Sequence, residues 1–142
     1  MLSLWLMAQG GPVPQQAAPP PDQVDVLAMD LRGGSRPERK YAARELLRQT
    51  RLSLRTLDRM PSDSLESLEA RQTLGELERE AVPACLTQLA EPATLRPCSE
   101  LLVLMESQAA IPVLVQAQEQ DTLSRRHLRV LARAESALRE LQ

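Results

Sequence analysis

The sequence predicts an all-α domain, a small α-solenoid of about four two-helix repeats. Its apolar residues are nearly all Leu, Ala, Val, Met and Ile, because the chain has one Trp, one Tyr and no Phe. β-Branched residues, which favour strands, are sparse, whereas Leu, Ala and Met are good helix formers. Apolar residues also recur every 28 or 29 positions. That period fits two short helices with their turns, so the fold is expected to be a superhelix of stacked helical hairpins.

The clearest copy of the repeat lies in the C-terminal half. Residues 81–86 read AVPACL, and residues 110–115 read AIPVLV. Steps of 28 towards the N-terminus keep apolar residues aligned, and the alternative is amphipathic helices in accidental register. The four aligned series are Val26, Leu54, Val82 and Ile111; Met29, Leu57, Cys85 and Leu114; Leu46, Leu74, Leu102 and Leu131; and Ala42, Ala70, Cys98 and His127. We expect these series to form the core, with all four leucines of the third series buried.

Each aligned unit divides into two helices. The first two series lie three residues apart, as on one helix face, and the last two lie four apart on the next helix. The units are expected at residues 24–49, 52–78, 81–106 and 109–141. Their internal turns are expected at Gly33-Gly34-Ser35, at Pro61 to Ser64, at Glu91-Pro92-Ala93-Thr94 and at Gln120-Asp121-Thr122.

Local signals fit the first two turns. Ser35 and Glu38 have the spacing of a capping box, which satisfies the free N–H groups at a helix start. Pro61 cannot continue a helix, and Ser62 or Ser64 is expected to cap the helix that follows.

Several segments also resemble a known repeat. Ala81-Val82-Pro83 and Ala110-Ile111-Pro112 place a proline in the first turn of their expected helices, where no intrahelical N–H bond is lost. These segments resemble the first helix of HEAT repeats, and more closely of the short HEAT-like repeats of the phycobilisome-lyase type. Residues 38–46, ERKYAAREL, resemble the second helix of that repeat, and residues 74–77, LGEL, resemble its end.

The resemblance covers roughly residues 24–134 and departs from the repeat pattern in places. Units one and two lack the proline, and His127 replaces a small residue. The resemblance implies a helical-repeat scaffold. It does not imply lyase activity, because unrelated binding proteins share the repeat.

Residues 1–22 are expected to lie outside the repeat domain, which then spans residues 23–142. Leu2–Ala8 is a short apolar run, and the Gly, Pro, Gln and Ala residues after it have the composition of a disordered linker. The apolar run is either part of a signal segment cleaved after Ala8 or Ala18, or a tail that docks on the domain. The location of the protein therefore stays open between the cytoplasm, which we favour slightly, and export.

Composition narrows the function classes. The net charge of −2 shows no overall bias towards nucleic acid or anionic lipid, and no apolar run reaches the roughly 18 residues of a membrane span. Two Cys and one His cannot supply the four ligands of an ordinary structural zinc site. The motifs HExxH, GxGxxG and the P-loop are absent. We therefore predict no metal, no cofactor and no small-molecule substrate.

The two cysteines carry an enzyme alternative. Cys98 and His127 occupy equivalent positions in neighbouring units, so a Cys–His nucleophile could form there. Against it, both cysteines fall in apolar series, where buried and inert thiols are usual. Cys85 and Cys98 also flank the expected turn at residues 91–94 at similar distances. We expect them to be buried, reduced and near each other.

Charge distribution is the most informative functional signal. Residues 32–59 hold nine basic and three acidic residues, and residues 63–106 hold nine acidic and three basic residues. Residues 107–142 are nearly balanced, with five basic and four acidic residues. Adjacent units of opposite sign could attract each other, or the basic block could serve a partner.

Two rows of basic residues give the candidate binding site. Each row steps by four residues and therefore lines one helix face, and the second helices of a solenoid line its concave surface. The alternative is a solvated exterior face. The candidate partner-binding residues are Arg36, Lys40, Arg44, Arg125, Arg129 and Arg133.

We therefore predict a non-catalytic protein–protein interaction or scaffold module whose partner has an acidic surface. The first alternative is nucleic-acid binding through the arginine-rich faces, although stacking aromatics are missing and the middle of the chain is acidic. The second is the enzyme with a Cys98/His127 site.

Overall fold

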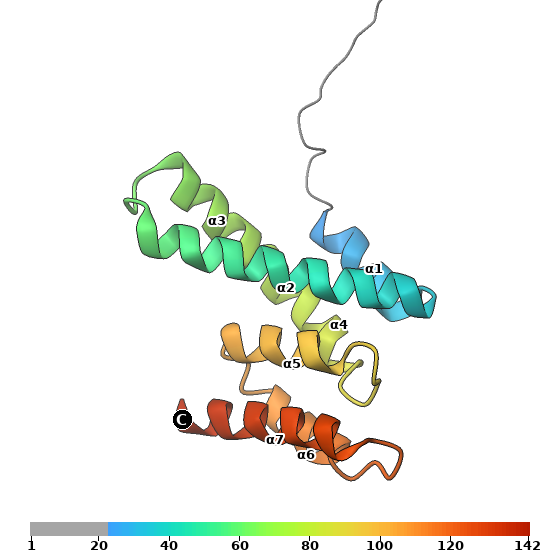
Figure 1. Ribbon diagram of the computed structural model, residues 1–142. Coiled ribbons are helices and arrows are strands. Elements are labelled where there is room, and N and C mark those ends of the chain that lie inside the picture. The colour runs from blue at the N-terminus through green and yellow to red at the C-terminus, as the bar shows by residue number, and fades with distance from the viewer. Residues whose placement is uncertain (1–22) are drawn as a thin grey trace, which may run out of the picture.

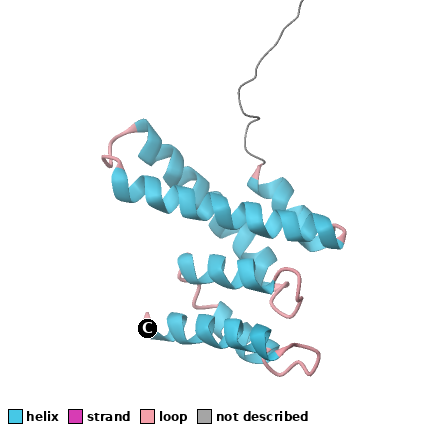
Figure 2. Ribbon diagram, viewed as in Figure 1, coloured by secondary structure: helices cyan, strands magenta, loops and turns pink. Residues whose placement is uncertain are grey.

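The computed structural model describes residues 23–142, and all regular secondary structure in this part of the chain is helical (Figures 1 and 2). The expectations for residues 1–22 lie outside it. Six helical rods result, because α3, the π-helix η1 and α4 run on without a break. The elements are α1 (Val24–Gly33), α2 (Arg36–Arg59), α3 (Leu65–Glu76), η1 (Leu77–Ala81), α4 (Val82–Leu86), α5 (Leu95–Leu104), α6 (Ala110–Ala117) and α7 (Arg125–Glu140).

The helices stack in two layers (Figure 1). One layer, the α2–α5–α7 layer, consists of these three helices, which contact one another in that order and begin at the same end of the molecule. The other layer, the α1–α4–α6 layer, contains α1, the rod formed by α3, η1 and α4, and α6. Across the layers α1 packs on α2, α4 on α5, and α6 on α7, while α3 packs along the rest of α2.

The predicted boundary between units one and two is wrong. α2 passes through it as one helix of 24 residues. The predicted boundary has neither Gly nor Pro, because it consists of Gln49, Thr50 and Arg51. Within the helix, the Thr50 hydroxyl donates a hydrogen bond to the Leu46 carbonyl at 2.8 Å. Nothing stops the helix before Met60, its C-cap, which precedes Pro61.

The predicted boundary between units two and three is also wrong. Residues 65–86 are continuously helical, so Pro83 lies within a rod and does not open a separate helix. The π-helix at residues 77–81 comes directly before it. A proline ring clashes with the carbonyl four residues earlier, and the wider π turn relieves that clash. Pro112, by contrast, lies in the first turn of α6 as predicted.

The other helix starts and turns are confirmed. The Ser35 hydroxyl accepts from the Glu38 N–H, and the Ser35 N–H donates to the Glu38 carboxylate at 2.7 Å, which completes the capping box. Ser64 caps α3, and Ser124 caps α7. Gly34 is required by close approach, because a Cβ there would lie 2.6 Å from the Asp30 carbonyl oxygen.

The core lies between the two layers. Leu46, Leu102 and Leu131 are fully buried, one on each helix of the α2–α5–α7 layer. Leu74 is only half-buried, because α3 belongs to the other layer and lies near one end of the stack. The leucine series is thus confirmed for three of its four members.

The prediction that Val26 and Met29, the α1 members of two aligned series, belong to the core is wrong. Val26 is 49% exposed and Met29 is 71% exposed. α1 instead buries residues spaced as one helical stripe, and a step of 28 residues misses this stripe because the chain takes a different path through α2. The buried stripe is Val24, Leu27, Ala28 and Leu31.

Candidate partner-binding groove

A groove of about 860 Å³ opens where α2, α5 and α7 begin. We call it the basic groove and define it by its charged and titratable lining. That lining is Arg36, Lys40 and Arg44 on α2, Arg96 and Glu100 on α5, and Arg126 and His127 on α7. Leu47 and the loop residues Pro92 and Ala93 contribute apolar wall.

All three residues of the predicted basic row on α2 line this groove. Arg36, Lys40 and Arg44 step by four, and all three side chains are exposed. The neighbouring residues Ala43 and Leu46 are buried against the core. The spacing therefore separates a charged outer face from an apolar inner face of the same helix.

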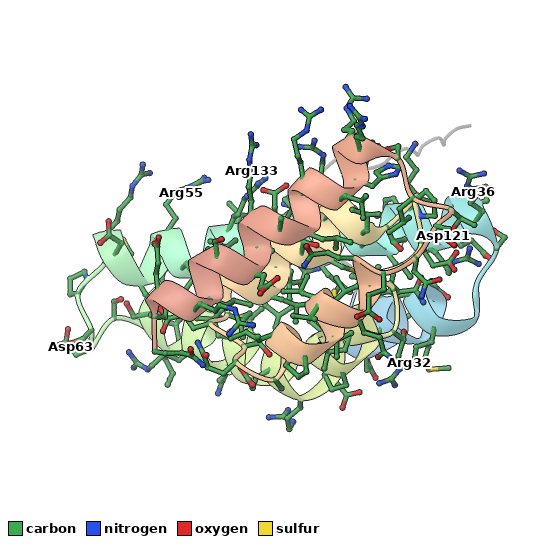
Figure 3. The ribbon with its side chains drawn as sticks, turned by 90° about the horizontal axis from the view of Figure 1, so that it is seen from below. Arg32, Arg36, Arg55, Asp63, Asp121 and Arg133 are labelled. Carbon is green, nitrogen blue, oxygen red and sulfur yellow. The ribbon has the colours of Figure 1, made fainter. Side chains whose placement is uncertain are left out.

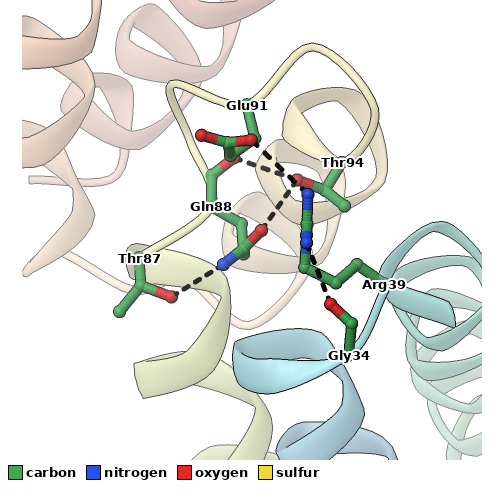
Figure 4. Close-up of polar contacts among 6 residues, drawn as sticks. All are labelled: Gly34, Arg39, Thr87, Gln88, Glu91 and Thr94. Atoms are coloured by element: carbon green, nitrogen blue, oxygen red, sulfur yellow. Dashed lines mark hydrogen bonds and ion pairs between the residues drawn. The ribbon is translucent and has the colours of Figure 1, made fainter. Parts of the chain in front are cut away.

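Arg39 joins the start of α2 to the loop that carries Pro92 and Ala93 of the groove lining (Figure 4). Its guanidinium donates to the Gly34 carbonyl at 2.9 Å and lies 3.7 Å from the Glu91 carboxylate. Arg39 therefore ties the start of α2 to the loop at residues 87–94, which leads into α5. This contact fixes the position of the α2 cations relative to Arg96.

Thr94 and Gln88 brace the same loop from inside. The Thr94 hydroxyl is buried and lies within hydrogen-bonding distance of the Gln88 carbonyl at 3.2 Å and the Gln88 side-chain oxygen at 3.3 Å. The Gln88 amide donates in turn to the Thr87 hydroxyl at 3.2 Å. These bonds satisfy polar groups that the loop buries as it crosses from one layer to the other.

The groove cations have no ionic partner within residues 23–142. No ion pair there involves Arg36, Lys40, Arg44, Arg96 or Arg126. Glu100, the one carboxylate in the lining, pairs with Arg51 instead. Three helix starts add positive potential at the same place, because the N-terminal end of a helix carries partial positive charge. The groove therefore attracts anions.

Internal attraction between the charge blocks accounts for only part of the basic block. Arg39 pairs with Glu91, and Arg51 pairs with Glu100, so both bridge the basic and acidic blocks. Arg48 pairs locally with Glu45. The row of Arg36, Lys40 and Arg44 takes part in none of these contacts, so attraction within the chain does not explain it.

The predicted row on α7 behaves differently. Arg125, Arg129 and Arg133 are exposed, and none of them lines the basic groove. Arg129 and Arg133 border a depression on the outer side of α7. Figure 3 shows Arg133 on α7 and Arg55 on α2 pointing to the same side, away from the other layer. Sequence reasoning missed Arg96, whose position at the start of α5 was the available signal, whereas Arg126, beside the predicted row on α7, lines the groove although that row does not.

The cysteines are buried, free and in contact, as expected. Burial raises the pKa of the Cys98 thiol well above its usual range, and its hydrogen bond with Cys85 acts in the same direction. His127 is hydrogen-bonded at the start of α7, where its Nδ1 lies 3.1 Å from the Ser124 hydroxyl. A buried neutral thiol is a poor nucleophile, so this geometry does not favour the Cys98/His127 alternative.

The described residues hold neither a cluster of metal ligands nor a helix that could span a membrane. No three His, Cys, Asp or Glu side chains there are grouped so that they could hold a metal ion. No helix from Val24 onwards is long and apolar enough to cross a membrane.

Comparison with known proteins found no matching family model, no matching curated protein and no matching solved structure. The HEAT-like resemblance therefore stays a prediction from the quoted segments.

Proposed function

We propose that this chain is a non-catalytic interaction module of the HEAT-like solenoid kind, and that its basic groove binds an acidic segment of a partner protein. One observation carries the proposal. Five cations from three helices line one groove, and none of them has an ionic partner in the described part of the chain. Like charges held together repel one another, so an acidic ligand would stabilise the arrangement.

The layered stacking supports the solenoid part of the proposal. The six rods form three hairpins, and the second and third hairpins each place their second helix beside the second helix of the hairpin before, which produces a ridged surface. Solenoids use such surfaces to bind extended segments of other proteins. Helix axes packed about 8–10 Å apart make three helices roughly 20 Å across, which matches about six residues of extended peptide.

Nucleic-acid binding is the second candidate. The outward arginines of α2 and α7, such as Arg55 and Arg133, favour it because they form a basic face beyond the groove (Figure 3). Against it, no Phe, Tyr or Trp side chain lines the groove, and the His127 imidazole is the one ring there on which a base could stack. A nucleic acid would also contact the face broadly, whereas the groove concentrates charge at one end.

Charge reversal tests the proposal. The groove variant combines Arg36→Glu, Lys40→Glu and Arg44→Glu. The matched control combines Arg32→Glu, Arg55→Glu and Arg59→Glu, which makes the same charge change at exposed positions outside the groove. With immobilised full-length chain as bait, we expect the groove variant to capture about tenfold less partner from lysate, by quantitative mass spectrometry, and the control to retain most of it.

Two further readouts separate the alternatives. Exposed charges contribute about 0–1 kcal/mol each, so the groove variant should unfold within a few degrees of the parent. Large loss of thermal stability with intact capture would make the row structural. Equal loss of capture in both variants, or captured material removed by nuclease, would contradict the groove and favour nucleic acid on the whole basic face.

A further inference from the structure

A second cleft lies beside the basic groove, between α5 and α7. Its volume is about 370 Å³. Branched aliphatic side chains line it, namely Val103 and Leu104 from α5 and Val130 from α7, with Ala134 and Ala137 beside them. Leu104 is 37% exposed although it is large and apolar. The cleft is thus an apolar surface open to solvent within a basic face.

The cleft and the groove are continuous. Arg96 and Glu100 line both of them. Along α5, Arg96, Glu100 and Val103 are spaced by four and three residues, so they lie on one side of the helix. Seven residues of helix rise about 10 Å, which is the length of about three residues of extended peptide. A single ligand can therefore reach from the cations into the cleft.

We infer that the occupant is a peptide segment of a partner protein that has acidic residues and, about three residues away, one aliphatic anchor. The inference rests on the proposed function and specifies its ligand. The acidic residues match Arg36, Lys40 and Arg126 in the groove, and the anchor matches the aliphatic cleft, where Arg133 and the Arg51–Glu100 ion pair form a polar rim. Nucleic acid lacks an aliphatic group of this kind, and the cleft has no aromatic lining on which a base could stack.

Two synthetic fluorescein-labelled peptides test the inference with the full-length chain. The first reads Leu-Ser-Ser-Glu-Glu-Glu-Ser-Ser-Leu, which offers an anchor on either side, and the second has Ser in place of both Leu residues. By fluorescence anisotropy, we expect the leucine peptide to bind about tenfold more tightly, because burial of one leucine outweighs the cost of ordering it. The methyl resonances of Val103 and Val130 should shift with the leucine peptide alone.

Matched variants locate the anchor. Leu104→Gln should reduce the preference for the leucine peptide to about threefold or less, because it removes aliphatic surface from the cleft. Leu68→Gln changes an exposed leucine on α3 in the other layer and should leave the preference intact.

The outcomes separate the anchor from the groove. Equal affinity for both peptides, weakened in the groove variant, would overturn the anchor and leave the proposed function standing. A leucine preference that survives Leu104→Gln would place the anchor elsewhere. Valine methyl shifts on dilution of the protein alone would identify a second copy as the occupant. Failure of both peptides, with tight binding of a single-stranded 20-nucleotide DNA, would overturn the proposed function as well.

Discussion

The two helical layers bury similar aliphatic residues on their inner sides but differ in charge. α2, α5 and α7 carry 14 of the 17 Lys and Arg residues and six carboxylates. The helices of the α1–α4–α6 layer carry three arginines and seven carboxylates. The charge blocks along the sequence thus become a difference between two faces. The core specifies the stacking, and charge distinguishes the face that would attract an acidic partner.

Within the α2–α5–α7 layer, ion pairs involve only some of the arginines. Glu45 pairs with Arg48, and Glu135 pairs with Arg139, each along its own helix. Glu100 joins α5 to α2 through Arg51. These carboxylates pair with arginines other than the five groove cations, which have no ionic partner within residues 23–142.

The largest expected effect compares how much a leucine from each layer contributes to the free energy of unfolding. Leu102→Ala removes a fully buried side chain from the centre of the α2–α5–α7 layer and should lower the free energy of unfolding by about 2–5 kcal/mol. Leu74→Ala removes a half-buried side chain from α3 and should cost less than half as much. Urea unfolding of the two variants measures both values. Equal losses would show that α3 is packed as tightly as α5.

A smaller effect concerns the loop that joins the layers. Thr94→Ala removes a buried hydroxyl with two hydrogen-bonding contacts to Gln88 and should cost about 1–2 kcal/mol. Ser99→Ala, in the helix that follows this loop, is the matched control, because the Ser99 hydroxyl is buried without a hydrogen-bond partner in the described chain. That change should be neutral or stabilise the fold by up to about 1 kcal/mol. Thermal unfolding that ranks the two variants the other way would contradict the role of Thr94 in the loop.

The smallest effect concerns carboxylates of the basic layer. Hydrogen bonds from Arg48 hold the pKa of Glu45 below its usual value, and Arg48 has a raised pKa because of the same pair. A depressed carboxyl pKa adds stability above the unfolded-state value, and this stability is lost as the pH falls through the folded-state value. Glu45→Gln should therefore cost about 0.2–0.5 kcal/mol at pH 7 and nothing at pH 2–3. A constant difference across that range would rule out the ion pair as the cause.

Local signals were predictable from the sequence, and packing between distant helices was not. Ser35 and Glu38 lie three residues apart, so their capping box could be identified without the fold. The shared face of Arg36 and Arg44 follows from helical spacing alone. Arg126 joins them only because α7 stacks beyond α5, and no local pattern encodes that.

The errors also have physical causes. A fixed repeat length does not show that α2 continues past residue 51, and a step of 28 residues places the exposed Met29 in the core. The same reasoning could not show that a π turn would keep Pro83 inside a rod.

We propose that an acidic partner segment binds at the starts of α2, α5 and α7. The most direct test is a titration of the ¹⁵N-labelled full-length chain with the anchor-free acidic peptide, followed by amide chemical shifts. We expect the largest shifts at residues 35–44, 92–97 and 125–128, and we expect these shifts to decrease as salt is added. Shifts spread over the outward arginines near Arg55 and Arg133, or centred on the α1–α4–α6 layer, would contradict it.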